Sequence, residues 1–286
     1  MITIVTPEGS STTEALKRAI ENLGSRCEIL LLSDSNLIVD KNFRLDSDII
    51  HPRCGIGNYL DRLTMYSWQV LNSLECEGST FINNLKTVYD SSDKFKTIKI
   101  LSKNKINTPK TAIVRDYEDA KRFMERENLE YPVILKNSFS KCGITVKKIT
   151  SDEELKKYTK NAIWEGTLVQ EYINFSKKGI YKDIRILVVG EEVVGGYSRV
   201  SKNFITNLYL GGTIEPIKLN EELNELALKC AQSMKGDIMG IDILPSKDDC
   251  YYVIETNAVP GIKGFKYLGI DVDYKIAEFL IEYGKS

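Results

Sequence analysis

Histidine is almost absent from this chain of 286 residues, which contains only His51. One imidazole cannot build a multi-histidine metal site, and it leaves little room for Ser-His or Cys-His nucleophilic catalysis. His51 precedes Pro52 in a segment that reads as a loop, so we expect a structural or solvent-facing role for it. Any chemistry must therefore use carboxylates, lysines, arginines and backbone amides.

The chain also lacks paired cysteines, an excess of charge and long apolar runs. Its six cysteines form no C-x-x-C pair, so neither a zinc site nor a disulfide framework is indicated. A net charge of -1 does not indicate nucleic-acid binding. No apolar stretch is long enough to span a membrane. With 42% hydrophobic and 28% charged residues, we expect a cytoplasmic globular protein of two or three small domains, without nucleic-acid or membrane partners.

Two common nucleotide-binding motifs are missing as well. The turn after the first strand, Thr6–Ser10, is not G-x-G-x-x-G, and no G-x-x-x-x-G-K-[ST] occurs. Strands at 1–5, 26–32 and 48–50 with a helix at 11–23 nevertheless predict a small parallel α/β unit. The segment Pro52–Gly57 follows its third strand, where such units bind ligands, although a plain glycine turn explains it equally well.

A second, smaller α+β unit is predicted after a boundary near residue 90. It begins with a helix near Ser91–Asp93 and continues with a helix at 117–127 and strands at 133–136 and 145–146. Lys136 closes a buried strand and opens the loop 137–143. A lysine leaving a strand into small polar residues suits a polyphosphate, although an ordinary hairpin connector fits this pattern too.

Two arginines stand inside apolar strands further along the chain. Residues 183–190 and 193–200 predict a hairpin, and a helix follows at 221–234. Arg185 and Arg199 need anionic partners there, either Asp183 and Glu192 or a ligand.

The segments 240–244 and 251–261 predict a second hairpin that carries oxygen ligands. A symmetric turn places Asp242 opposite Val253, so that Glu255 is a diagonal neighbour on the same face as Asn257. No cationic side chain is close to Asp242 in sequence, and two carboxylates with an amide suit Mg²⁺ bound to substrate phosphates. Two edge-strand acids facing water are the alternative.

These features occur in an order that resembles the ATP-grasp superfamily, and more narrowly the RimK-type amino-acid ligases, including archaeal α-glutamate ligases that extend coenzyme tails. The resemblance covers nearly the whole chain. It rests on Asp93-Lys94, Lys136 with its loop, Gln170-Glu171-Tyr172-Ile173, Asp183-x-Arg185, Arg199, Asn207, Gly211-Gly212, Asp242 and Glu255-Thr256-Asn257-Ala258-Val259-Pro260-Gly261.

The family implies an α/β and α+β fold of three domains. We expect an N-terminal parallel α/β domain at 1–90, a central lid domain at 91–173, and a C-terminal antiparallel-sheet domain with the metal site at 174–286. ATP is held between the last two in this family.

The resemblance also implies roles for individual residues. Lys94 and Lys136 would contact phosphates, and the loop residues Ser138, Lys141 and Gly143 would close over them. The nucleotide would be bound by Gln170, Glu171, Tyr172, Ile173 and Asp183, and two Mg²⁺ or Mn²⁺ ions by Asp242, Glu255 and Asn257. Arg185, Arg199 and Asn207 would be catalytic, and the acceptor would contact Arg53, Gly55, Gly57, Gly211 and Gly212.

Two departures from the family pattern bear on activity. The phosphate loop is usually richer in glycine, whereas Gly143 is the only glycine here. The family also often carries an arginine after the phenylalanine of its F-R-x-N segment, where this chain has Ile205. Both features would suit a nucleotide-binding regulator that does not turn over.

The function expected from the resemblance is an ADP-forming ligation of a carboxylate and an amine. Such chemistry needs charge stabilisation and positioning but no protein nucleophile. The amine would be L-glutamate, and the acceptor a coenzyme such as tetrahydromethanopterin or F420, with a protein C-terminus or an amino-acid carrier as alternatives. A phosphotransferase acting on a hydroxyl would need a general base, for which no clear candidate exists. Homo-oligomerisation is left open.

Overall fold

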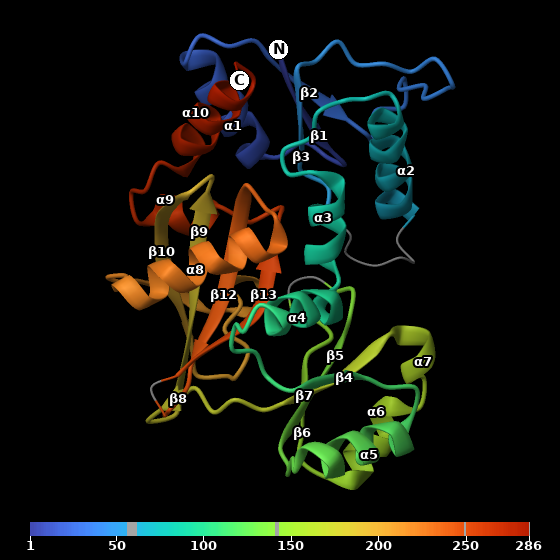
Figure 1. The fold of residues 1–286 in the computed structure, drawn as a ribbon, viewed down its shortest axis with the longest axis vertical. Coiled ribbons are helices and arrows are strands. Elements are labelled where there is room, and N and C mark those ends of the chain that lie inside the picture. Colours follow the sequence, from blue (N-terminus) through green and yellow to red (C-terminus); the bar gives the residue numbers. More distant parts are fainter. Residues whose placement is uncertain (56–61, 141–142, 249, 286) are drawn as a thin grey trace.

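Three lobes make up the structure, a computed structural model that describes residues 1–55, 62–140, 143–248 and 250–285 (Figure 1). Each lobe is built around one β-sheet, of three, four and six strands in the described residues. The parallel sheet of the first lobe and the antiparallel sheets of the others give the α/β and α+β class expected from the sequence. Within the described residues, no helix combines the length and the apolar character needed to cross a membrane.

The N-terminal sheet has the order β2-β1-β3, with β1 at Ile2–Thr6, β2 at Cys27–Leu31 and β3 at Ile49–Pro52. Helix α1 (Ser11–Asn22) begins at a capping box in which the Ser10 side chain accepts from the Thr13 N–H. The expectation that His51 lies in a loop is wrong, because His51 belongs to β3 and is fully buried, with Nδ1 2.6 Å from the carbonyl oxygen of Ile82. Its role is structural.

Three helices connect this sheet to the central lobe: α2 (Arg62–Cys76), α3 (Leu85–Ser92) and α4 (Lys94–Lys103). Local sequence patterns predict α4 but not α2 or α3. Asp93 ends α3 and caps α4, since its carboxylate accepts from the N–H groups of Phe95 and Lys96. The cap fixes the direction in which the next side chain, Lys94, leaves the helix.

The central lobe is a four-stranded sheet of order β4-β7-β5-β6, covered on one face by helices (Figure 1). Its core is a separate apolar cluster that includes Phe123, Leu135 and Val169. The predicted strand at 145–146 is wrong, because these residues form a turn that precedes β6. The elements are β4 (Thr111–Ile113), α5 (Tyr117–Glu127), β5 (Val133–Asn137), β6 (Lys147–Ile149), α6 (Asp152–Thr159), α7 (Ala162–Glu165) and β7 (Thr167–Glu171).

The C-terminal sheet has the order β11-β10-β9-β12-β13, and β8 pairs with β9. Long apolar runs make β9 and β12 its buried centre, and the amphipathic α8 covers one face, as Figure 1 shows. The elements are β8 (Ser176–Lys177), β9 (Ile180–Val189), β10 (Glu192–Ser201), the 3-10 helix η1 (Leu208–Leu210), β11 (Thr213–Pro216), α8 (Glu221–Met234), β12 (Ile238–Pro245), β13 (Tyr251–Asn257), α9 (Lys263–Tyr267) and α10 (Val272–Tyr283).

The N-terminal and C-terminal lobes share one core. A single apolar cluster joins Ile4 and Leu16 of the first lobe to Leu187, Phe265 and Ile276 of the last. The C-terminal helix α10 lies beside α1, which brings the two ends of the chain to the same side of the molecule (Figure 1). The central lobe, which has its own core, faces this joint body across the cavity described next.

Candidate active site

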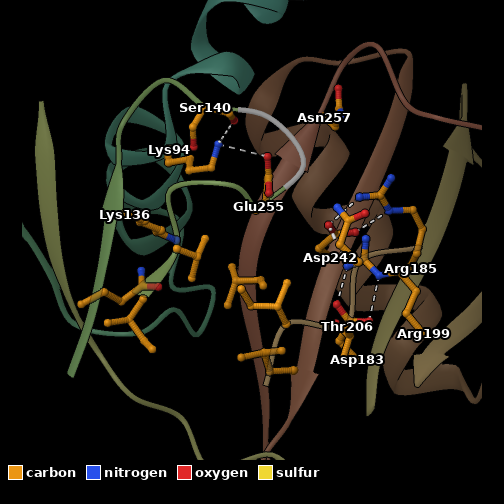
Figure 2. A pocket seen from close by; sticks show the side chains of 18 of the residues that line it. Lys94, Lys136, Ser140, Asp183, Arg185, Arg199, Thr206, Asp242, Glu255 and Asn257 are labelled. Carbon is orange, nitrogen blue, oxygen red and sulfur yellow. Dashed lines mark hydrogen bonds and ion pairs between the residues drawn. The ribbon is translucent and has the colours of Figure 1, made fainter. Parts of the chain in front are cut away.

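A cavity of about 460 Å³ lies between the central sheet and the β12–β13 hairpin (Figure 2). Its size is within the range of small-molecule sites. One end of the cavity is apolar and the other is densely charged. Its lining residues are Arg53, Gly55, Ser91, Ser92, Lys94, Pro109, Ile134, Lys136, Ser140, Gly143, Val146, Gln170, Glu171, Tyr172, Ile173, Phe175, Asp183, Arg185, Arg199, Phe204, Ile205, Thr206, Asn207, Asp242, Leu244, Ile254, Glu255, Asn257, Val259 and Gly261.

The apolar end is formed where β7 leaves the central sheet. Ile173 packs with Phe175 and Leu244 in a small apolar cluster, with Ile254 beside it. Gln170 is buried and donates to the Thr111 hydroxyl at 2.7 Å. This combination of aliphatic walls and a few fixed polar groups suits a flat heteroaromatic ring.

Two buried lysines, from α4 and from β5 of the central sheet, lie on the side of the cavity opposite the hairpin, as Figure 2 shows. Lys94 donates to the carbonyl oxygen of Ser140 at 2.6 Å, and its Nζ lies 3.4 Å from Oε1 of Glu255. Its backbone N–H donates to the carbonyl oxygen of Ser138, whose hydroxyl donates to Asp93. These hydrogen bonds connect the N-cap of α4 to the start of the loop that follows β5.

Lys136 is the second of these lysines, near the end of β5. Burial, together with the nearby charge of Lys94, lowers the pKa of Lys136 to about 8, against the opposing attraction of Glu255. In the part of the chain that the structure describes, no carboxylate lies within ion-pair distance of its ammonium. An anionic ligand in the cavity would satisfy that charge.

The opposite wall is the β12–β13 hairpin, whose register differs from the symmetric pairing expected. Asp242 is paired with Glu255 rather than with Val253, because a β-bulge leaves Ile254 without a partner on β12. The two carboxylates are therefore directly opposite each other, not diagonal. Asn257 is paired with Gly240 further along the hairpin and lines the same cavity.

The expectation that Asp242 has no neutralising partner is also wrong. Both carboxylate oxygens of Asp242 accept from Arg185, at 2.5 Å each, and one of them lies 3.0 Å from Arg199. The sequence hides these partners, since they come from β9, which pairs with β12, and from β10, which pairs with β9. Burial disfavours the charged carboxylate, but the attraction of the two arginines outweighs it and holds the pKa of Asp242 below its usual range.

Asp183 completes this buried network by accepting from Arg199 through both carboxylate oxygens. Glu192, the other partner suggested for the arginines, instead lies beside Lys275 at 3.3 Å. Two carboxylates and two guanidiniums thus neutralise one another at one end of the cavity. Such bidentate pairs hold each side chain in one geometry.

Hard oxygen ligands for a divalent metal are present on the hairpin wall. Glu255 is about one-third exposed to the cavity, and the Asn257 side-chain oxygen accepts from the Val259 N–H at 2.9 Å. A carboxylate has about four lone-pair sites, and Asp242 uses three of them for its contacts with the arginines. One lone-pair site of Asp242 is therefore left for a metal ion. These donors fit Mg²⁺ that also binds substrate phosphates, with Asp242 shared between metal and arginines. Within the described chain, histidine, cysteine, aspartate and glutamate side chains form no cluster of three that could hold a metal by themselves.

The loop 203–212 closes the charged end of the cavity. Gly211 has a φ of +95°, and a Cβ on Gly212 would lie 2.0 Å from the carbonyl oxygen of Thr206. Both glycines therefore shape the loop that carries Thr206 and Asn207 into the cavity, and neither lines it within the described residues. Ile205 adds an apolar side chain to the lining of the cavity. It lies close to Gly143, because a Cβ built on that glycine would be 3.4 Å from Cγ2 of Ile205.

Arg53 enters the cavity from the N-terminal lobe. Its Nη2 donates to the carbonyl oxygen of Pro260 at 3.0 Å, and its buried Nη1 has no hydrogen-bond partner among the described residues. Burial lowers the pKa of Arg53 to about 10, against the attraction of Asp273, and the guanidinium remains charged. Gly55 lies next to it in the lining.

Most of the residues selected from the sequence converge on this one cavity. Ser138 does not line it, because its hydroxyl is directed at Asp93, and Gly57 and Lys141 lie outside the described residues. Several lining positions belong to no motif and are not predicted from the sequence, since their apolar character is the only signal for most of them. These are chiefly Pro109, Ile134, Val146, Phe175, Leu244 and Ile254.

Comparison with known proteins identifies the relatives of this chain. The RimK-like ATP-grasp domain family matches residues 91–280. The coenzyme gamma-F420-2:alpha-L-glutamate ligase of Methanococcus maripaludis is 64% identical over 286 residues, which is 100% of each chain. The ligase of the same name from Methanocaldococcus jannaschii is 58% identical and covers 100% of this chain and 99% of its own.

Among solved structures, the RimK domain ATP-grasp protein from Sphaerobacter thermophilus resembles this chain with a TM-score of 0.75. The two are 17% identical, and the match covers 97% of this chain and 98% of the other. This likeness supports the three-lobed ATP-grasp fold.

Proposed function

The chain belongs to the RimK-like ATP-grasp family, and we propose that it is an ADP-forming ligase that adds L-glutamate to coenzyme γ-F420-2. The observation that carries the choice of acceptor is the 64% identity, over the full length of both chains, to a coenzyme gamma-F420-2:alpha-L-glutamate ligase. Tetrahydromethanopterin, a protein C-terminus and an amino-acid carrier have no comparable support.

The cavity is suited to ATP in one orientation. The adenine would occupy the apolar end beside Ile173 and Leu244, and the phosphates would extend toward Lys94 and Lys136. Asp242, Glu255 and Asn257 would hold two Mg²⁺ ions, which supply charge neutralisation for the polyphosphate when bound. The buried ammonium of Lys136 supports this placement, because it has no carboxylate partner among the described residues and the phosphates would provide the negative charge.

The proposed reaction has two steps. A carboxylate oxygen of the acceptor attacks the γ-phosphorus of ATP, the bond to the bridging oxygen breaks, and an acyl phosphate and ADP form. The uncharged amine of glutamate then attacks the acyl carbon, the C–O bond to phosphate breaks, and the leaving phosphate takes the proton that the nitrogen loses, which gives the amide and inorganic phosphate. The substrates supply both nucleophiles, which agrees with a site that contains no histidine.

The protein's part in these steps is to position groups and to stabilise negative charge. Arg53 would hold the acceptor carboxylate, because it lines the cavity and its buried Nη1 has no hydrogen-bond partner in the described chain. Arg185 and Arg199 would face the transferred phosphoryl group while Asp242 and Asp183 keep them in place. Asn207 would contribute a neutral hydrogen bond from the loop.

Incubation with γ-F420-2, ATP, Mg²⁺ and L-glutamate tests the proposal directly. We expect ADP release that depends on both acceptor and glutamate, with mass spectrometry showing one or more added glutamyl residues. Tetrahydromethanopterin serves as the control acceptor. ADP release with that acceptor but not with γ-F420-2 would refute the assignment, and AMP as the nucleotide product would refute the reaction course.

A further inference from the structure

A smaller cavity, of about 230 Å³, lies in the central lobe on the face of the sheet that the helices cover (Figure 1). Side chains alternate along a strand, so Leu135 and Asn137 of β5 share this face, as does Thr167, which pairs with Asn137 on β7. Lys136 lies between them and borders both cavities, but its ammonium belongs to the candidate active site. A water molecule takes about 30 Å³ in the liquid, so the cavity has room for a small ion with a few waters.

Three lysines place positive charge in this cavity: Lys147 of β6, Lys157 of α6 and Lys160 at the end of α6. The ammoniums of Lys147 and Lys157 lie 4.5 Å and 5.1 Å from the centroid of the Tyr158 ring, so two cations gather around one side chain. In the described parts of the chain, none of the three lysines has a carboxylate within ion-pair distance. Glu165 is the only carboxylate among the described lining residues, so positive charge is in excess.

The uncharged polar groups of the cavity can all donate a proton. The Thr167 side chain is 2% exposed, and its hydroxyl has no hydrogen-bond partner among the described residues. The Thr145 hydroxyl accepts from the N–H of Asn137 at 3.2 Å, and no described residue takes its proton. Tyr158 and the amides of Asn137 and Asn161 complete this set of donors. A buried hydroxyl without a partner calls for a bound group, and here that group has to accept protons.

From these contacts we infer that the cavity binds a small oxyanion of the phosphate class. The oxygens of the ion would accept from the ammoniums of Lys147 and Lys157 and from the Thr167 hydroxyl. These donors come from β6, α6 and β7, and four oxygens of a phosphate serve three directions better than the two of a carboxylate. A cation would be repelled by the lysines, and a neutral ligand would leave their charge uncompensated. The inference goes beyond the proposed ligase activity, since these donors do not line the candidate active site.

A simpler explanation covers only part of this arrangement. Cations at the carboxyl end of a helix interact favourably with its dipole, which accounts for Lys157 and Lys160 without any ligand. It does not account for Lys147, which comes from a strand, or for the buried hydroxyl of Thr167. Lys156 occupies the same last turn of α6 but lies outside the lining, against a different aromatic ring. Lys156 therefore provides a control that shares the helix end and not the cavity.

Isothermal titration calorimetry with inorganic phosphate tests the site. Saturating Mg²⁺ and a non-hydrolysable ATP analogue fill the candidate active site, and an ionic strength of about 0.15 M limits the Debye length to about 8 Å. We expect saturable binding in the millimolar range or tighter. Thr167→Val, a nearly isosteric change, and Lys157→Gln should each raise the Kd roughly three- to ten-fold, which corresponds to about one hydrogen bond. Lys156→Gln removes the same charge from the neighbouring position and should leave the Kd unchanged.

Several outcomes would overturn the inference. Phosphate binding that disappears when the ATP analogue is present would place the ion in the candidate active site. Absence of saturable binding, or equal weakening by Lys156→Gln and Lys157→Gln, would show attraction by surface charge without a site. Sodium chloride at the same ionic strength is the control for screening and should give no saturable heat. Lys157 is exposed, so its substitution tests the site even if Thr167→Val disturbs the fold. Ligation is not part of the readout, so this inference and the proposed function can fail separately.

Discussion

We predict that Asp242→Asn destabilises the fold, whereas Glu255→Gln on the neighbouring strand removes activity without doing so. Asp242 is 3% exposed and accepts three contacts from Arg185 and Arg199. In the variant, an amide with two N–H donors faces two guanidiniums that only donate. Glu255, by contrast, is about one-third exposed, and its one ion pair among the described residues is with Lys94, at 3.4 Å.

The magnitudes follow from these contacts. Removing one partner of a buried ion pair costs about 3 to 5 kcal/mol, because the remaining charge stays buried and unpaired. A partly exposed pair such as Glu255–Lys94 contributes about 0 to 1 kcal/mol. At about 2 °C or more per kcal/mol, Asp242→Asn should lower the apparent melting temperature by at least about 6 °C. Turnover should fall roughly a hundred-fold or more in Glu255→Gln.

Thermal unfolding followed by circular dichroism, together with kcat at saturating Mg-ATP, distinguishes the two effects. Asp248→Asn, an exposed substitution in the turn of the same hairpin, is the matched control and should change neither quantity. A wild-type melting temperature for Asp242→Asn would show that the arginine contacts contribute little to stability. Near-normal turnover of Glu255→Gln at saturating Mg²⁺ would refute the metal assignment.

Three further results are expected. Burial lowers the pKa of Lys136 to about 8, so its ammonium is present below that pH and lost above it. The KM for ATP should therefore rise between about pH 7 and about pH 9. Lys136→Arg should abolish this rise. A wild-type KM that does not change with pH would contradict this role. In steady-state kinetics, Arg53→Ala should raise the KM for γ-F420-2 about ten-fold or more and leave the KM for ATP unchanged. A raised KM for ATP with an unchanged KM for γ-F420-2 would show that Arg53 does not bind the acceptor. Gly212→Ala should lower kcat at least about ten-fold, because its Cβ would collide with the carbonyl oxygen of Thr206, and a fully active variant would show that the loop adapts.

Local patterns predicted much of this fold from the sequence. Both ends of the predicted helix at 221–234 agree with the structure, and Asn220 caps its first turn. The β9–β10 hairpin follows from two β-prone runs on either side of a glycine turn. The order of the motifs identified the family, and most motif residues meet in one cavity.

Long-range contacts explain where the sequence reading was wrong. The bulge at Ile254 is marked by no glycine or other special residue, so a symmetric turn gave the wrong partner for Asp242. Arg185 lies 57 positions before Asp242, and only the pairing of β9 with β12 brings their side chains together. His51 preceding Pro52 suggested a loop, yet both residues end a buried parallel strand.

The acyl phosphate distinguishes the proposed reaction from adenylation of the acceptor, and transfer of an oxygen isotope detects it. γ-F420-2 labelled with ¹⁸O in its reacting carboxylate would be incubated with ATP, Mg²⁺ and L-glutamate until the amide has formed. If the carboxylate attacks the γ-phosphorus, one labelled oxygen leaves with the phosphoryl group, and mass spectrometry finds ¹⁸O in inorganic phosphate. Label in AMP, or pyrophosphate released in step with amide formation, would contradict the mechanism.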